Sequence, residues 1–206
     1  MRLPYAPQSA EGLSTDTHEI YSRIATRRSP RPLIPLDLAL LHAPQVADGY
    51  NSFVGALRSK TILHAAFLEL SISRIAVLNK AVYEWNIHAP LALKAGVTAL
   101  ELQELLSLPS FTEATERSAD AWRQTCLTAR QQAIVAYTDA MTDSVSVSDE
   151  VFQDLVSAGL SNREIVELTT TVAGYNCVSR ILVALDVGEN NAREMKSVAE
   201  LVGNHT

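Results

Sequence analysis

The stretch ELSISRIAVLNKAVYEWNIH, residues 69–88, decides the fold and carries the candidate chemistry. It joins a segment that is apolar nearly all round, residues 61–79, to a second segment that runs from Tyr83 to Lys94 and stops at Gly96. A helix without a polar face is typical of a protein interior, and glycine commonly ends a helix. We therefore expect two consecutive buried helices.

Helical patterns continue through the rest of the chain with almost no strand signal, which predicts an all-α protein. Residues 1–35 are polar and interrupted by prolines, so we interpret them as an N-terminal extension with one short helix. Residues 36–206 are expected to form a single helical domain. The further helices that we expect cover residues 17–26, 36–41, 45–57, 116–141, 149–158, 162–185 and 192–201.

One joint occurs twice in the sequence: a glycine that ends a helix, then a hydroxyl residue and, three positions later, a glutamate. This is the capping-box arrangement. The residues of the two joints are Gly96, Thr98 and Glu101, and Gly159, Ser161 and Glu164. The repetition is compatible with two related halves, about 36–108 and 109–206. Turn chemistry also converges easily, so the duplication stays open.

Glu69, Glu84 and His88 are the candidate catalytic residues. Glu84 and His88 are four positions apart and so share one face of a helix, while Glu69 lies in the apolar segment before them. A buried carboxylate needs a partner or a perturbed pKa. Two carboxylates and an imidazole in an apolar pocket are the groups that proton transfer requires.

The spacing leaves their individual roles open. His88 could deliver a proton, and Glu84 could orient its ring. Glu69 could act as an acid if burial keeps it neutral, or as a base if it is ionised. Structural alternatives also remain: a satisfied core histidine, a buried pair of Glu69 with Arg74 or His88, and a cap or surface salt bridge for Glu84.

Five further residues are candidates for binding a substrate. Tyr83 and Trp85 flank the pair on the second buried helix, and Tyr175 and Asn176 could line the pocket from the second half. Arg74 could bind a substrate carboxylate, because its planar guanidinium suits that group. The aromatic residues could equally pack in the core.

Composition excludes several classes of function. The 206 residues have a net charge of −6, which argues against a nucleic-acid surface. We interpret the short basic cluster of Arg27, Arg28 and Arg31, followed by Pro32, as a solvated loop. The sequence contains no phosphate-binding glycine loop, dinucleotide fingerprint or zinc motif, so neither a cofactor nor a metal is indicated.

The lack of a targeting signal and the spacing of the cysteines both favour a cytoplasmic protein. The N-terminus lacks a hydrophobic signal core, and no charge-free apolar run is long enough to span a bilayer. Cys126 and Cys177 are far apart and without metal-ligand spacing. We expect reduced structural thiols in a cytoplasmic protein that binds neither membrane nor nucleic acid.

The motif Tyr83-Glu-Trp-x-x-His88 resembles the carboxymuconolactone decarboxylase family of the alkylhydroperoxidase D-like superfamily. The likeness covers roughly residues 36–187 and includes the segments 40–44, 91–97, 147–150, 160–161 and 171–180. The resemblance implies an alkylhydroperoxidase D-like helical bundle. It also implies a pocket between the subunits of a homo-oligomer, either a dimer, a trimer or a hexamer.

Peroxidase members of that superfamily carry two cysteines between a glutamate and a histidine. The resemblance aligns Glu69 and His88 with these two residues, and it puts Ala81 and Glu84 at the cysteine positions. Disulfide chemistry needs two sulfurs in reach of one another, so we do not expect a thiol peroxidase. The pattern is similar to the decarboxylase-like branch, whose members act on small organic acids and lactones without a cofactor.

These observations predict a cofactor-free enzyme, a lyase, whose partner is a small-molecule substrate. Its substrate would be a small organic acid, a lactone or a polyketide-like intermediate of secondary metabolism. Decarboxylation is the favoured reaction. Isomerisation, dehydration or cyclisation would use the same groups, and a ligand-binding homologue without chemistry is the alternative from another class.

Overall fold

The computed structural model describes residues 1–113 and 115–203, and within these ranges it contains helices and no strand, so the predicted all-α class is confirmed. The helices are α1 (Thr15–Arg28), α2 (Pro35–Leu40), α3 (Pro44–Ser59), α4 (Ala65–Leu78), α5 (Val82–Lys94), α6 (Ala99–Ser107), α7 (Glu116–Gln124), α8 (Ala129–Asp143), α9 (Asp149–Ser157), α10 (Asn162–Leu185) and α11 (Val198–Gly203).

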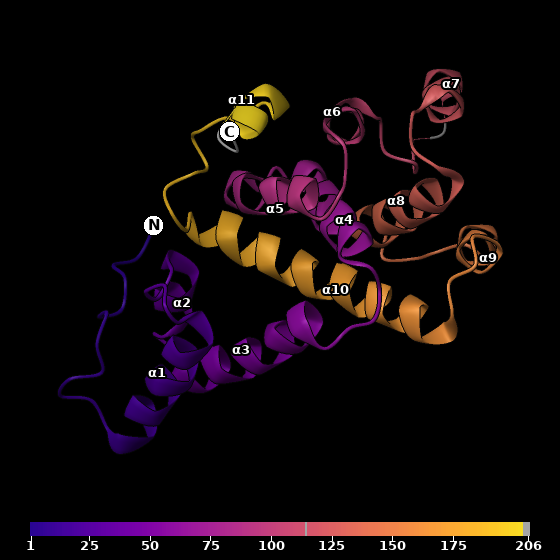
Figure 1. Ribbon diagram of the computed structural model, residues 1–206. Helices are drawn as coiled ribbons and strands as arrows, with labels where there is room; N and C mark the ends of the chain where they lie inside the picture. Colours follow the sequence, from indigo (N-terminus) through magenta and orange to yellow (C-terminus); the bar gives the residue numbers. More distant parts are fainter. Residues whose placement is uncertain (114, 204–206) are drawn as a thin grey trace.

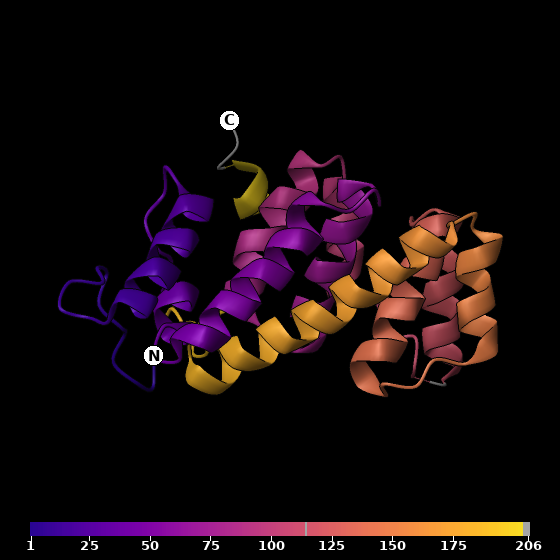
Figure 2. The ribbon, with the colours of Figure 1, turned by 90° about the horizontal axis from the view of Figure 1, so that it is seen from below.

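The longest helix, α10, runs the length of the molecule (Figures 1 and 2). Helices α1–α3 lie at its C-terminal end, α7–α9 lie at its N-terminal end, and α4 and α5 lie between them. The chain's N-terminus meets the end of α10, where the amide of Arg2 donates to the carbonyl of Leu185. This arrangement brings α1, α3, α5 and α10 together around one space.

The centre of the core is α4, as its apolar sequence predicts. Residues 68–76 are all buried, and the helix packs against α5, α6, α8 and α10. Ile72 and Ile75 belong to the cluster that α4 shares with α8 and α10, while Leu70 and Ala76 belong to the cluster shared with α5 and α6. Glu69 lies on α4, and the helices that pack on both sides of α4 fix its position.

The start of α4 differs from the expected one. The helix begins at Ala65 rather than Thr61, with His64 as its N-cap. The amides of Ile62 and Leu63 instead donate to a carboxylate oxygen of Glu167 on α10, at 2.8 and 2.9 Å. A long-range contact thus fixes the chain in an extended form that the apolar pattern alone does not predict.

The single helix expected over residues 116–141 is also wrong, because the structure has two helices there. Helix α7 ends at Gln124, and α8 begins at Ala129 after Thr128, whose hydroxyl accepts from the amide of Gln131 while the Gln131 side chain accepts from the amide of Thr128. This capping box starts a new helix in a new direction.

Both predicted joints are present. Gly96 and Gly159 have φ values of +104° and +81°, and the capping boxes at Thr98 and Ser161 are both formed. The common ancestry of the two halves stays a prediction. The final helix, α11, spans 198–203 rather than 192–201.

By length and composition alone, α10 could cross a membrane. Core helices of soluble proteins pass the same test, and α10 packs against α3, α4, α5 and α8. A cytoplasmic location remains a prediction.

Candidate active site

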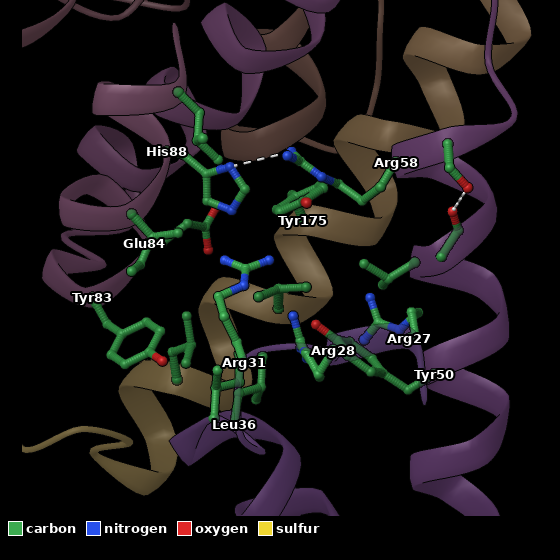
Figure 3. Close-up of a pocket in the computed structure, with 18 residues that line it drawn as sticks. Arg27, Arg28, Arg31, Leu36, Tyr50, Arg58, Tyr83, Glu84, His88 and Tyr175 are labelled. Carbon is green, nitrogen blue, oxygen red and sulfur yellow. Dashed lines mark hydrogen bonds between the residues drawn. The ribbon is translucent and has the colours of Figure 1, made fainter. Parts of the chain in front are cut away.

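A cavity of about 350 Å³ lies between α1, α3, α5 and α10 (Figure 3). Its walls combine apolar residues such as Val54 and Leu182 with a set of polar side chains. The polar lining consists of Arg27, Arg28, Arg31, Arg58, Ser59, Tyr50, Tyr83, Tyr175, Glu84 and His88. This mixture of an apolar wall and convergent polar groups is typical of small-molecule sites.

Glu69 is buried at one side of this cavity and holds two partners. Its Oε2 lies 2.8 Å from Nδ1 of His88, and its Oε1 accepts a hydrogen bond from Nη1 of Arg58. Burial acts to raise the pKa of Glu69, but the hydrogen bonds from His88 and Arg58 and the charge of Arg58 outweigh it and leave that pKa below its ordinary value. Glu69 is therefore ionised at neutral pH.

His88 presents a base to the cavity. Burial lowers its pKa, the hydrogen bond to Glu69 acts in the opposite direction, and the charge of Arg58 lowers it further, so the imidazole is neutral at neutral pH. Because an ionised carboxylate only accepts hydrogen bonds, Nδ1 carries the proton and Nε2 keeps its lone pair. In Figure 3, Nε2 faces the middle of the cavity. The dashed contact from Arg58 to Nδ1 is 3.5 Å, too long to compete with the contact to Glu69.

Glu84 has the opposite character. It lies one turn before His88 on α5 and is 1% exposed, and neither carboxyl oxygen has a hydrogen-bond partner within the described part of the chain. Burial raises its pKa well above the ordinary value, so Glu84 is a neutral acid at neutral pH. The expectation that Glu84 orients the imidazole is wrong, because Glu69 makes that contact.

Four arginines were not predicted at this site: Arg27, Arg28, Arg31 and Arg58. The interpretation of the first three as a solvated loop is wrong for Arg27 and Arg28, which form the last turn of α1. Arg31 does lie in an exposed loop, but its guanidinium points into the cavity (Figure 3). A basic cluster in a chain of net charge −6 was the available signal. It could not reveal that α1 packs on α3 and turns this cluster towards α5.

Three tyrosines complete the wall. Tyr83 and Tyr175 lie where the sequence predicted them, and Tyr50 of α3 joins them. The Tyr175 ring meets the His88 ring edge-on, with centroids 5.0 Å apart. Burial raises the pKa of all three phenols, to about 12 for Tyr83 and Tyr175, so they stay protonated and can donate hydrogen bonds.

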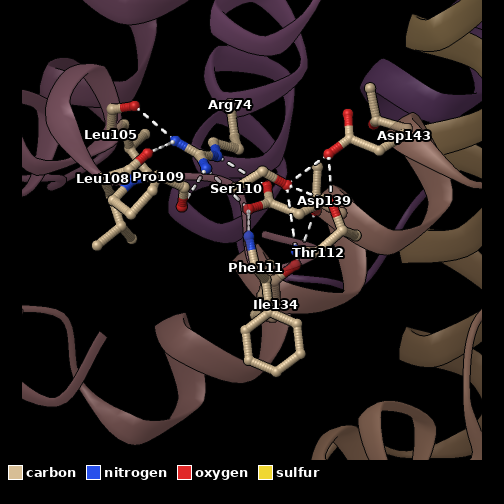
Figure 4. Close-up of polar contacts among 12 residues, drawn as sticks. Arg74, Leu105, Leu108, Pro109, Ser110, Phe111, Thr112, Ile134, Asp139 and Asp143 are labelled. Carbon is tan, nitrogen blue, oxygen red and sulfur yellow. Dashed lines mark hydrogen bonds and ion pairs between the residues drawn. The ribbon is translucent and has the colours of Figure 1, made fainter. Parts of the chain in front are cut away.

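Arg74 does not bind at this cavity, which corrects the sequence-based expectation (Figure 4). Its Nε and Nη2 donate to the carboxylate of Asp139 at 2.7 Å. The remaining N–H groups donate to the carbonyls of Leu105, Leu108 and Pro109. Fully buried, with all five donors used, Arg74 is a structural tie between α4, α8 and the segment after α6.

Trp85 and Asn176 are likewise structural, and neither lines the cavity. Trp85 is fully buried, and its indole N–H donates to the carbonyl of Lys196. For Trp85, the structure therefore agrees with the core-packing alternative. Asn176 on α10 donates to Thr142 of α8 and accepts from Asn79 at the end of α4. Its amide joins three helices instead of facing a ligand.

The remaining chemistry-bearing groups lie elsewhere. Cys126 and Cys177 are free and exposed, and neither lines the cavity. Among the residues described, no group of three or more histidine, cysteine, aspartate or glutamate side chains has the arrangement of a metal site.

Residues 44–126 match the sequence model of the carboxymuconolactone decarboxylase family, which confirms the predicted resemblance over this segment. The segment includes Glu69, Glu84, His88 and Arg58, and it excludes the arginines of α1 and the loop after it. No protein of curated function matches the chain by sequence.

Two solved structures, both of uncharacterized peroxidase-related proteins, are similar to this chain. The one from Ralstonia eutropha JMP134, described as an alkylhydroperoxidase AhpD core, has a TM-score of 0.69 and 13% identity over 90% of each chain. The one from Silicibacter sp. TM1040 has a TM-score of 0.64 and 15% identity over 94% of this chain and 99% of the other. The fold is therefore AhpD-like.

A third similar structure is that of the debrominase Bmp8 in complex with 2,3,4-tribromopyrrole. It has a TM-score of 0.59 and 13% identity over 99% of this chain and 97% of the other. At such identities the likeness shows the fold and leaves the reaction to the residues of the site.

Proposed function

We propose that this protein is an enzyme that performs acid–base chemistry on a small organic acid or lactone without a cofactor, and that decarboxylation is its leading reaction. One observation carries the proposal: a neutral buried acid, Glu84, and a neutral imidazole, His88, border the same cavity one helical turn apart. The pair has a proton to give and a lone pair to receive one. Oppositely perturbed groups of this kind are the usual basis of acid–base catalysis near pH 7.

In the proposed decarboxylation, the bond between the substrate's carboxylate and its neighbouring carbon breaks. Carbon dioxide leaves, and the electron pair moves into an adjacent carbonyl to give an enolate. Glu84 then gives its proton to the enolate and is reprotonated from solvent, so that one proton is consumed for each carbon dioxide released. Glu84 thus replaces His88 as the proposed proton donor, because Nε2 of His88 carries no proton at rest.

Isomerisation is the second candidate, and the free lone pair of Nε2 favours it. His88 would remove a proton from carbon to give the same type of enolate, and Glu84 would protonate it at another atom. Proton exchange with solvent would then return His88 to its neutral form and Glu84 to its protonated form. The match to the decarboxylase family supports the first reaction. Both reactions need the neutral acid, whereas only isomerisation needs the base to begin.

A panel of keto acids and carboxylated lactones tests the proposal, with carbon dioxide release and deuterium uptake from solvent as separate readouts. The expected result is turnover that Glu84→Gln lowers by about a hundredfold or more, the usual contribution of a positioned proton donor. Glu194→Gln, an exposed carboxylate outside the cavity, is the control. Equal turnover in the wild type and Glu84→Gln would contradict the proposal.

A non-catalytic ligand-binding protein is the alternative from a different class. It predicts saturable binding of members of the panel with no carbon dioxide release and no deuterium uptake. The unpaired oxygens of Glu84 argue against it, since a protein without chemistry gains nothing from a buried acid that has no partner.

A further inference from the structure

We infer that Arg27 and Arg31 form an anion subsite that anchors a carboxylate of the substrate within the cavity that Glu84 and His88 border. The inference deepens the proposed function and rests on it for the reacting end of the substrate. The subsite itself follows from the charges and partners of the arginines around the cavity.

The four arginines of the cavity fall into two pairs. Arg28 makes a double hydrogen bond with the carboxylate of Asp37, both distances being 2.8 Å, and Arg58 is paired with Glu69. No ion pair holds Arg27 or Arg31 within the described part of the chain. The cavity therefore carries two positive charges that its own acidic residues do not neutralise.

Of the two arginines, Arg27 gives the stronger evidence for an anion subsite. Its Nε donates to the side chain of Asn51, but its Nη2 is buried and has no hydrogen-bond partner among the residues described. Burial lowers its pKa, with the charge of Arg28 acting in the same direction, which is the signature of a cation in an unfavourable setting. A buried charged group without a partner is costly, and an anion in the cavity would remove that cost.

Arg31 approaches the cavity from the loop that follows α1, and Figure 3 shows its guanidinium pointing inwards. The Arg31 backbone amide donates to the carbonyl of Arg28, which fixes the start of this loop. Arg27 and Arg31 thus face one space from two directions. Two planar donor groups that converge in this way suit the flat, two-oxygen shape of a carboxylate.

The size of the cavity limits which classes of ligand can fit. A volume of about 350 Å³ is near the lower end of ligand pockets, which makes a free small acid a better fit than a nucleotide or a carrier-bound intermediate. The subsite also lies outside the segment that matches the family model, residues 44–126. This chain's N-terminal segment would therefore supply the selectivity for a charged substrate.

Binding without turnover tests the subsite, by titration calorimetry with glutarate, its uncharged diamide glutaramide, and inorganic phosphate as probes. We expect glutarate to bind, glutaramide not to bind, and Arg27→Gln and Arg31→Gln each to weaken glutarate binding by about tenfold or more, the usual loss for a hydrogen bond to a charged group. Arg23→Gln is the matched control, because Arg23 lies one turn earlier on α1 and pairs with Asp48.

Equal glutarate affinity in the wild type and in Arg31→Gln, an exposed position whose change leaves the core intact, would overturn the inference. Tighter binding of phosphate than of glutarate would overturn the choice of a carboxylate. Turnover of the keto-acid panel by the wild type separates this result from the proposed function, because the glutarate titrations measure binding alone. If the wild type binds glutarate but turns over no member of the panel, the proposed function is rejected and the subsite is kept.

Discussion

At the scale of single residues, burial and partners give two nearby glutamates opposite protonation states. Glu69 has Arg58 and His88 to hold its charge, whereas Glu84 is buried with no partner among the described residues. The first is therefore an ionised support for the imidazole, and the second is a neutral acid. Both residues are glutamates on buried helices. Their protonation states differ because other helices bring charged partners to Glu69 and none to Glu84 among the described residues.

Glu84→Gln is expected to make the protein more stable than the wild type at alkaline pH. Between the ordinary glutamate pKa of 4.5 and the raised folded value, the folded wild type keeps a proton that the unfolded chain has lost. Its free energy of unfolding therefore falls as the pH rises, by at most about 1.4 kcal/mol per pH unit from this group, and the glutamine variant lacks this loss. Chemical denaturation from pH 4 to pH 9 checks it; a constant difference between the two proteins would contradict it.

Glu69→Gln is expected to lower the stability by about 2 kcal/mol at neutral pH, because Arg58 and the Nδ1 proton of His88 lose their charged acceptor. The folded pKa of Glu69 is lowered, so its stabilisation is present above the ordinary value and is lost as the pH falls. The gap between wild type and variant should thus shrink on acidification. Asp48→Asn, which removes a partly exposed pair with Arg23, should cost less stability than Glu69→Gln, because solvent screens that pair.

Sequence reasoning identified some of the residues of the cavity and missed others. The four-residue spacing placed Glu84 and His88 on one face, and both line the cavity. Spacing could not reveal that Arg58 of α3 and Arg27 of α1 line the same cavity, because that depends on how distant helices pack. Arg74 was misassigned for the same reason: its partner, Asp139, is 65 residues away.

At the scale of elements, the site depends on how helix ends and joints are held. Tyr83 packs at the start of α5 against the turn that follows α10. A Cβ on Gly188 in that turn would lie 2.5 Å from Cδ2 of Tyr83, and Gly188 has a φ of +75°. The turn therefore needs glycine both for its backbone and for the tyrosine ring beside it.

Gly188→Ala is expected to destabilise the protein and to raise KM, because the new methyl group must displace Tyr83 from the cavity wall. Gly96→Ala is the matched control: its φ is +104°, and nothing lies within 4 Å of the added Cβ. The control should lose only the strain of a positive φ, about 1–2 kcal/mol. Thermal unfolding and KM measured for both variants check this, and identical effects on KM would contradict the role given to the turn.

Arg74→Met is expected to lower the stability by about 3 kcal/mol or more without changing KM, because it leaves the buried carboxylate of Asp139 without its cation and unties α4 from α8. Thermal unfolding and initial-rate kinetics provide the two measurements. An increase in KM at unchanged stability would instead restore the substrate-binding role that the sequence suggested.

The elements also show where patterns fail. Long, mostly apolar runs predicted that α4, α5 and α10 exist, because a core helix presents an apolar surface to its neighbours. The start of α4 is the exception. Periodicity carried one expected helix through residues 125–128, where a threonine cap starts a new helix instead. A capping signal is short and local, so a continuing pattern on both sides of it can hide it.

At the scale of the whole molecule, α10 is the axis on which the N-terminal segment and the central helices meet. The segment interpreted as an extension buries Ile20, Tyr21 and Ile24 of α1 and supplies three arginines to the cavity. It is thus part of the site as well as part of the core.

We also expect a homo-oligomer. Large apolar side chains such as Phe53, Ile62 and Val166 are exposed on the single chain, and association with other copies would bury apolar surface of this kind. Light scattering on the purified protein should give a multiple of the 22.4 kDa chain mass. A mass equal to that of one chain at micromolar concentration would contradict the expectation.

The most direct test of the central claim is the protonation state of Glu84, which needs no substrate. Infrared difference spectroscopy between the wild type and Glu84→Gln, with glutamate carrying a carboxyl isotope label, isolates this one group. We predict the carbonyl band of a protonated acid at pH 7, with no matching carboxylate band. A carboxylate band at pH 7 with no protonated acid would contradict the account, because Glu84 would then have no proton to give.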